Sequence, residues 1–194
     1  GVCTGRPVKR LDAHRRASLD HFEEQFAQVL RQRAAVGNAT SWGELGLVSG
    51  GKGRDIGVPW DGPGAKNGPH FKVIVPMYKV EEWIWRNIRS LRMQRYTNFH
   101  AVLVDDASPD NTAALARREI GGDNRFTLLQ RQRRHLALHN TVDAIKLASP
   151  KDEDVIVILD GDDWLFDETA LGTIADAYVT HECWVTYGTF LEYP

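Results

Sequence analysis

Val155-Ile-Val-Ile-Leu-Asp160-Gly-Asp-Asp-Trp-Leu165 is the segment with the strongest structural signal in the chain. Its first five residues are apolar without a break, and four of the five are β-branched. Such a run is typical of a short strand that is buried on both faces of a parallel sheet. Three carboxylates follow within four positions, and Gly161 between them allows the backbone to turn sharply.

The three carboxylates, Asp160, Asp162 and Asp163, have a chemical consequence. They repel one another, which raises the pKa of at least one of them unless a divalent cation neutralises the charge. Oxygen ligands favour a hard ion, Mg²⁺ or Mn²⁺, which commonly shares its coordination shell with substrate phosphates. Ligands of open α/β sheets bind at the carboxyl ends of strands, where these acids lie. We therefore expect metal–phosphate chemistry here, with a solvated acidic turn as the alternative.

The composition indicates an ordinary globular protein. The chain has 194 residues, of which 42% are hydrophobic and 26% charged, enough for one domain with or without an extension. The net charge of −2 provides no field that would attract nucleic acid, so no nucleic-acid partner is expected. The sequence contains no apolar run of membrane-spanning length and no signal-peptide core. Localisation stays unknown, with the cytoplasm favoured.

The two cysteines, Cys3 and Cys183, form neither a metal-ligand pattern nor a disulfide framework. Two free thiols in a reducing compartment are the simpler interpretation, and a single disulfide is the alternative.

Residues 1–70 are expected to form an N-terminal extension. Apolar residues at three- and four-residue steps predict a helix over about residues 11–36. Residues 37–70 are rich in glycine and proline and are interpreted as a loop or linker. Residues 46–53 nearly match a phosphate-binding P-loop, but Gly53 stands where that motif needs Ser or Thr, so we reject this interpretation.

From residue 71 onward, strand and helix patterns alternate. Strands are predicted over 71–75, ending at Pro76, and over 101–104, 126–129, 155–159 and 184–187. Helices are predicted over 80–94, from a Ser108-Pro-Asp110 start, over 135–147 and over 167–181. The alternation predicts an α/β domain over 71–194, with a doubly wound, mainly parallel sheet and helices on both faces.

Polar and aromatic side chains follow three of these strands. The first ends at Pro76-Met-Tyr78, the second at Asp105-Asp106, and the fourth at the acidic segment. Parallel strands end at the same sheet edge, so an aromatic ring, a carboxylate pair and a metal-type cluster should meet there. A ring can stack on a nucleotide base, a carboxylate can accept a base N–H, and acids with a metal can hold a diphosphate. The pattern predicts a site for a nucleotide diphosphate derivative.

Three motifs in this order resemble those of the family 2 glycosyltransferases, which have the GT-A fold. Residues 71–79 (Phe-Lys-Val-Ile-Val-Pro-Met-Tyr-Lys) look like the opening strand of that family. Residues 104–112 (Val-Asp-Asp-Ala-Ser-Pro-Asp-Asn-Thr) resemble its second-strand motif, and residues 158–165 resemble its metal-binding acidic signature, the DxD motif. The resemblance covers about residues 71–190 and none of the first 70.

The resemblance implies roles for individual residues. Tyr78 would stack on the base, Asp106 would hydrogen-bond it with support from Asp105, and Asp160 would contact the ribose or diphosphate. Asp162 would bind Mn²⁺ or Mg²⁺. The nucleotide-sugar-binding set implied in this way is Pro76, Tyr78, Asp105, Asp106, His139, Asn140 and Asp160, and the metal set is Asp162, Asp160 and Asp163.

Two departures from the family pattern concern the donor site. Lys79 stands where the family commonly has Asn, and His139 stands where it often has Arg or Leu. His139 can replace an arginine phosphate contact only in part because it is mostly neutral at pH 7. Arg131, Arg133 and Arg134 could supply positive charge nearby, with a solvated basic turn as the default interpretation.

The resemblance implies a metal-dependent glycosyltransferase of hexosyltransferase type. It would be inverting and would transfer sugar from a nucleotide-diphosphate sugar, with UDP-sugars favoured, to an unidentified acceptor hydroxyl. The catalytic base stays unknown: Glu192 is a candidate by order alone, and its place at the end of the fifth strand argues against it. We expect the base and the acceptor half to lie outside this chain. The alternatives are a catalytically silent nucleotide-sugar-binding module and a nucleotidyltransferase, the latter disfavoured because no glycine-rich loop follows Val75.

Overall fold

The computed structural model describes residues 2–4, 59–181 and 183–188. The helix expected over 11–36 and the P-loop-like residues 46–53 lie outside them. The elements are, in chain order, β1 (Val2–Thr4), α2 (Gly64–Asn67), β2 (Phe71–Met77), α3 (Ile84–Arg92), β3 (Phe99–Asp105), α4 (Thr112–Ile120), β4 (Phe126–Gln130), α5 (Ala137–Ala148), β5 (Val155–Ile158), α6 (Ala170–Thr180) and β6 (Val185–Tyr187).

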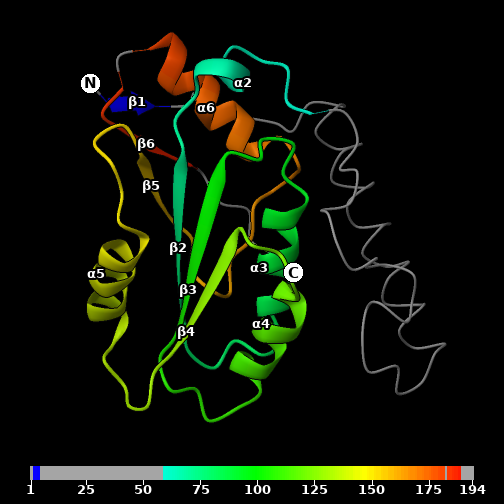
Figure 1. Cartoon of the computed structure of the whole chain (residues 1–194), viewed down its shortest axis with the longest axis vertical. Coiled ribbons are helices and arrows are strands. Elements are labelled where there is room, and N and C mark those ends of the chain that lie inside the picture. The colour runs from blue at the N-terminus through cyan, green and yellow to red at the C-terminus, as the bar shows by residue number, and fades with distance from the viewer. Residues whose placement is uncertain (1, 5–58, 182, 189–194) are drawn as a thin grey trace, which may run out of the picture.

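The main sheet has four parallel strands in the order β4-β3-β2-β5, which confirms the predicted α/β fold (Figure 1). From β2 the chain adds β3 and β4 on one side and then returns to add β5 on the other. The order therefore reverses between β2 and β5. In open α/β sheets such a switch point is where a crevice forms outside the carboxyl ends of the strands.

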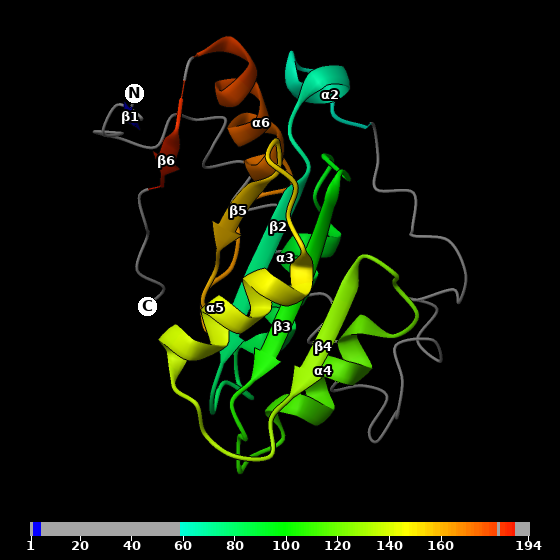
Figure 2. The ribbon, with the colours of Figure 1, turned by 60° about the vertical axis from the view of Figure 1, so that its left-hand side comes forward.

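Helices cover both faces of the sheet, as the two views show (Figures 1 and 2). On one face, α3 packs its apolar stripe of Ile84, Ile88 and Leu91 onto the strand residues in the larger of two buried apolar clusters. On the other face, Ala144 and Ala148 of α5 form a smaller cluster with β2 and β3. Small residues let α5 approach the sheet closely, and the burial of both faces stabilises the doubly wound arrangement.

The expectation that the strand before the acidic segment is buried on both faces is wrong. Ile156 and Ile158 of β5 are 39% and 51% exposed. Ile158 is in register with the buried Ile74 of β2, so the two side chains point to the same face of the sheet. That face is covered by α5, which packs on β2 and β3. Because β5 lies at the edge of the main sheet, the helix leaves this face of it open to solvent.

Two predicted boundaries are also corrected. β2 runs through Pro76 to Met77, although Pro76 was expected to end it. The backbone pairing of β2 with β5 ends at the Ile74–Ile158 pair. The backbone N–H that Pro76 lacks would therefore lie past the last paired residue of β2 on that side. α4 begins at Thr112 and not near Ser108, and the Ser108 hydroxyl, expected to cap the helix, accepts the backbone N–H of Lys79 (3.1 Å).

The predicted fifth strand forms as β6 but does not join the main sheet. It pairs in parallel with β1 in a separate two-stranded sheet, and β1 was not among the predicted strands. Cys183, just before β6, is disulfide-bonded, so the free-thiol interpretation is wrong and its support for a reducing compartment is lost. No helix in the described part of the chain has the length and apolar character that a bilayer crossing requires.

Residues 59–70, within the stretch expected to be a loop, contain α2, which packs on α6. Asp176 of α6 accepts the Trp60 indole N–H (3.0 Å) and the backbone N–H of Gly64 (2.7 Å) through the same carboxylate oxygen. A Cβ at Gly64 would lie 2.7 Å from the Ala175 Cβ, so only glycine permits this approach. The last part of the glycine-rich stretch is therefore fixed against the domain.

Candidate functional site

The carboxyl end of β2 holds the two acid-bearing loops on either side of it. On one side, the backbone N–H of Gly161 donates to the Pro76 carbonyl (3.1 Å), which extends the contact with β5 into the acidic segment. On the other side, the N–H of Asp106 donates to the Met77 carbonyl (2.9 Å). The structure therefore brings the Tyr78 loop, the Asp105-Asp106 pair and the acidic segment together at one edge of the sheet.

The acidic turn, defined here as residues 160–163, depends on glycine at its second position. Gly161 is buried, and a Cβ there would lie 2.7 Å from the Met77 Cβ and 3.2 Å from the Pro76 carbonyl oxygen. The turn closes with a hydrogen bond from the N–H of Asp163 to the Asp160 carbonyl (3.0 Å). Close backbone approach to β2 therefore fixes where the three carboxylates emerge.

The carboxylates of the acidic turn are exposed and influence one another. Asp160, Asp162 and Asp163 all lie on the solvent side of the turn. Partial burial raises the pKa of Asp163, and the negative charges of Asp162 and Asp160 raise it further. The turn therefore presents closely spaced negative charge to a ligand at the switch point.

Within the described part of the chain, no group of three or more His, Cys, Asp or Glu side chains is arranged to hold a metal ion. The acidic turn is thus no preformed metal cage. Its oxygen donors nevertheless fit Mg²⁺ or Mn²⁺, because such ions are usually bound through one or two carboxylates, with substrate phosphates and water completing the shell. The donor set fits a metal that is shared with a phosphorylated substrate.

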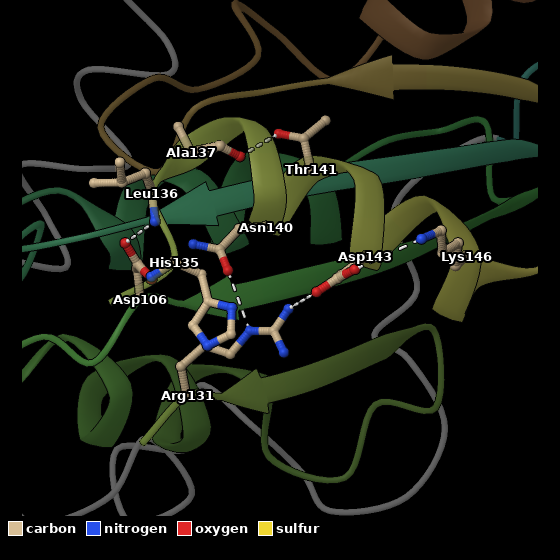
Figure 3. Close-up of polar contacts among 9 residues, drawn as sticks. All are labelled: Asp106, Arg131, His135, Leu136, Ala137, Asn140, Thr141, Asp143 and Lys146. Atoms are coloured by element: carbon tan, nitrogen blue, oxygen red, sulfur yellow. Dashed lines mark hydrogen bonds and ion pairs between the residues drawn. The ribbon is translucent and has the colours of Figure 1, made fainter. Parts of the chain in front are cut away.

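Asp106 is tied to the loop that begins α5 (Figure 3). Its two carboxylate oxygens accept the backbone N–H groups of His135 (2.6 Å) and Leu136 (3.0 Å), and the residue is only 3% exposed. Burial alone would raise the pKa of Asp106. The nearby Asn140 amide and the two backbone donors outweigh burial, so the pKa lies below its ordinary value. Asp106 therefore stays ionised and anchors this loop.

Tyr78 lies against Arg134, a contact that sequence reasoning missed. The Arg134 guanidinium is 3.8 Å from the centroid of the Tyr78 ring, and its Nε is 3.6 Å from the Asp106 carboxylate. One face of the ring is thus covered by a cation. More than fifty positions separate the two residues, and no local pattern links them. Arg133 next to it is exposed, as expected for a solvated basic turn.

Other predicted site residues have structural partners. Asp105 is fully buried and accepts the N–H of Ser108 (3.3 Å), and Pro76 is partly buried within β2. Asn140 is buried and accepts the Arg131 Nε–H (3.1 Å), and Arg131 also pairs with Asp143 (Figure 3). His139, at the start of α5, is exposed. Asp105 and Asn140 therefore hold the loops, while His139 is open to solvent.

Asn87 is a second residue that sequence reasoning missed. Its side-chain amide donates to the carbonyls of Asp160 (2.9 Å) and Asp163 (2.8 Å), which are the two ends of the acidic turn. The signal was present in the sequence, because position 87 falls on the apolar stripe of α3 next to Ile84 and Ile88. A polar residue on an inward-facing stripe needs hydrogen-bond partners.

Comparison with known proteins places these features in a family. The model of glycosyl transferase family 2 matches residues 72–194. Glycosyltransferase GlyG of Streptococcus pneumoniae serotype 4 is 26% identical over 123 residues, which is 63% of this chain and 40% of GlyG. A mannosyltransferase from Pyrobaculum calidifontis, solved with GDP-Man and Mn²⁺, aligns with a TM-score of 0.51 and 27% identity, covering 65% of this chain and 36% of that one.

TarS of S. aureus, solved with UDP-GlcNAc, aligns with a TM-score of 0.50 and 26% identity over 58% of this chain and 32% of the TarS chain. The chain thus spans less than half the length of these three relatives. The sheet order, the acidic turn and the matched residues lead to one conclusion. The chain belongs to glycosyl transferase family 2 and has the α/β fold of the GT-A glycosyltransferases.

Proposed function

We propose that residues 71–194 form a nucleotide-sugar-binding domain that transfers a sugar to an acceptor hydroxyl, as a metal-dependent, inverting glycosyltransferase of hexosyltransferase type. Residues 1–70 are an extension to it. The acidic turn beside the end of β2 carries the proposal, because it presents three exposed carboxylates at the switch point of the sheet. The sugar nucleotides in the titles of the Pyrobaculum and TarS structures support the same ligand class.

Charge explains why we propose a metal. A diphosphate is itself anionic, so three exposed carboxylates would repel it unless a cation lay between them. A bound Mn²⁺ or Mg²⁺ would be held by Asp162, with Asp160 and Asp163 contributing, and would supply Lewis-acid stabilisation of the leaving diphosphate.

The base-binding half of the site lies on the other side of β2. We propose that the base stacks on Tyr78 and that the Asp106 carboxylate accepts a base N–H, for which the uracil N3–H is suited. Two backbone donors already occupy the Asp106 oxygens, which leaves further lone pairs for a ligand. A base that stacks on Tyr78 uses the ring face opposite Arg134 or displaces that side chain.

In the proposed transfer, the acceptor oxygen forms a bond to the anomeric carbon as the bond from that carbon to the diphosphate oxygen breaks. The nucleoside diphosphate leaves from the opposite side, so the configuration inverts. The hydroxyl proton passes to a general base. We assign no residue to that base.

Two substitutions test this assignment by calorimetric titration with UDP-sugars and GDP-sugars, in Mn²⁺ and in a chelator. Asp162→Ala should abolish the metal-dependent part of donor binding while the melting temperature stays unchanged, because the side chain is exposed. Asp106→Ala should weaken binding in both conditions. Unchanged nucleotide-sugar affinity in Asp162→Ala would contradict the proposed metal site. If Asp106→Ala weakened binding only when Mn²⁺ is present, the proposed contact between Asp106 and the base would be wrong.

A further inference from the structure

Three buried polar residues lie along α3 and just past its end: Asn87 and Ser90 are within the helix, and Gln94 is two residues beyond Arg92. Asn87, Ser90 and Gln94 are each no more than 1% exposed. Their spacing of three and four residues places them on one side of α3 and of the turn that ends it, where the Gln94 N–H donates to the Leu91 carbonyl (3.2 Å), and we call the three residues the polar stripe. Buried polar groups stabilise a fold only when they are hydrogen-bonded, so the partners of this polar stripe indicate what it does.

The polar stripe forms hydrogen bonds with the backbone that runs from the acidic turn into α6. Asn87 donates to the carbonyls of Asp160 and Asp163. Ser90 accepts the N–H of Leu165 at 3.1 Å. Further along, the Gln94 amide donates to the Asp167 carbonyl (2.6 Å) and accepts the Leu171 N–H (2.9 Å). α3 and the turn that follows it thus fix this connection at three successive points.

Asn87 differs from the other two because it holds the acidic turn itself. Both of its partners are carbonyl oxygens, so the NH₂ of the amide must face the turn. Its Oδ1 is buried with no hydrogen-bond partner among the described residues. An unsatisfied buried oxygen is unfavourable, so the contribution of Asn87 comes from its two donors. Those donors clamp both ends of the segment that carries the three carboxylates.

We infer that Asn87 is a positioning residue for the acidic turn: by holding the carbonyls of Asp160 and Asp163 it sets the placement of the carboxylates that bind the metal. The effect of Asn87 on metal binding rests on the proposed function, whereas its two hydrogen bonds to the acidic turn, the clamp, do not. Removal of a group that orients metal ligands without touching the metal typically weakens metal affinity 10- to 100-fold. Asn87 therefore acts on the metal through the backbone of the turn.

The test compares Asn87→Leu with Gln94→Leu. Both replace a fully buried amide of the polar stripe with an apolar side chain, and only the first releases the acidic turn. Amide hydrogen exchange in metal-free protein should speed up at residues 160–165 in Asn87→Leu and at residues 167–171 in Gln94→Leu. Mn²⁺ affinity, measured by electron paramagnetic resonance with and without UDP, should fall on the order of tenfold in Asn87→Leu alone. Asn87→Ser keeps one hydrogen-bond donor, so its exchange rates and its Mn²⁺ affinity should lie between those of wild type and Asn87→Leu. Asn87→Ser takes the place of Asn87→Leu in the test if Asn87→Leu fails to fold.

Each possible result supports or contradicts the clamp, the positioning role of Asn87 or the proposed function. Unchanged exchange at residues 160–165 in the Asn87 variants would overturn the clamp. Faster exchange with unchanged Mn²⁺ affinity would overturn the positioning role, and so would equal losses of Mn²⁺ affinity in the Asn87 and Gln94 variants, because these would reflect stability alone. Wild-type protein that binds no Mn²⁺ would instead contradict the proposed function, while the exchange data would still test the clamp.

Discussion

Gly161→Ala should destabilise the protein, because the added methyl group would lie too close to β2 and the loop after it. Its Cβ would be 2.7 Å from the Met77 Cβ and 3.2 Å from the Val80 Cγ2. Carbon atoms in contact prefer separations of roughly 3.5–4.0 Å, so the turn or β2 must move by about 1 Å. That movement would strain or break the hydrogen bond from the Gly161 N–H to the Pro76 carbonyl.

The expected loss of unfolding free energy combines three contributions. Overpacking of a tight site costs about 1–3 kcal/mol, and loss of one hydrogen bond about 1 kcal/mol. Against this, alanine stabilises by up to about 1 kcal/mol through the lower entropy of the unfolded chain. The hydrogen-bond and entropy terms nearly cancel, so we expect the free energy of unfolding, measured by urea denaturation, to fall by about 1–3 kcal/mol.

Gly122→Ala is the matched control. Nothing lies within 4 Å of a Cβ at Gly122, and its backbone is not in the left-handed region. That variant should unfold within about 0.5 kcal/mol of wild type or be slightly more stable. If Gly161→Ala unfolds at the same urea concentration as Gly122→Ala, the acidic turn does not approach β2 as closely as described. The placement of the three carboxylates at this sheet edge would then be wrong too.

Two further predictions concern the loops at the same edge. Lys79 has a φ of 56°, a left-handed conformation that Asn adopts more readily, so Lys79→Asn should raise the free energy of unfolding by up to about 1 kcal/mol in urea; a destabilised variant would contradict this. The lowered pKa of Asp106 means that its ionised form contributes stability above its ordinary pKa and loses it as the pH falls through the lower folded value. As the pH falls below about 4, the free energy of unfolding should therefore fall more steeply in wild type than in Asp106→Asn, and parallel curves would argue against the anchor.

The order of elements could be predicted because each depends on local pattern. Apolar β-branched runs gave the main strands, and helical spacing gave α3, α5 and α6 to within a few residues. The exposure of β5 could not be predicted, since a continuous apolar run looks the same at the edge and in the centre of a sheet. Which face α5 covers depends on tertiary packing, and the run of Val155 to Leu159 carries no sign of it.

For the site, the sequence placed the acidic turn and Asp106 at one edge because parallel strands end together. It could not find the Arg134–Tyr78 contact, which joins distant loops through space. It also missed what holds the carboxylates in place. Asn87 was visible only as a polar residue on an apolar stripe, and its partners are backbone carbonyls that lie more than seventy positions away.

The most direct test of the proposed function is calorimetric titration of wild-type protein with a panel of nucleotide sugars, first with Mn²⁺ and then with a chelator, alongside an assay of donor hydrolysis. We expect binding of at least one UDP- or GDP-sugar that requires the metal, with slow hydrolysis of that donor. Metal-dependent binding without any hydrolysis would point to a silent binding module. Absence of binding to every donor with Mn²⁺ present would contradict the proposed function.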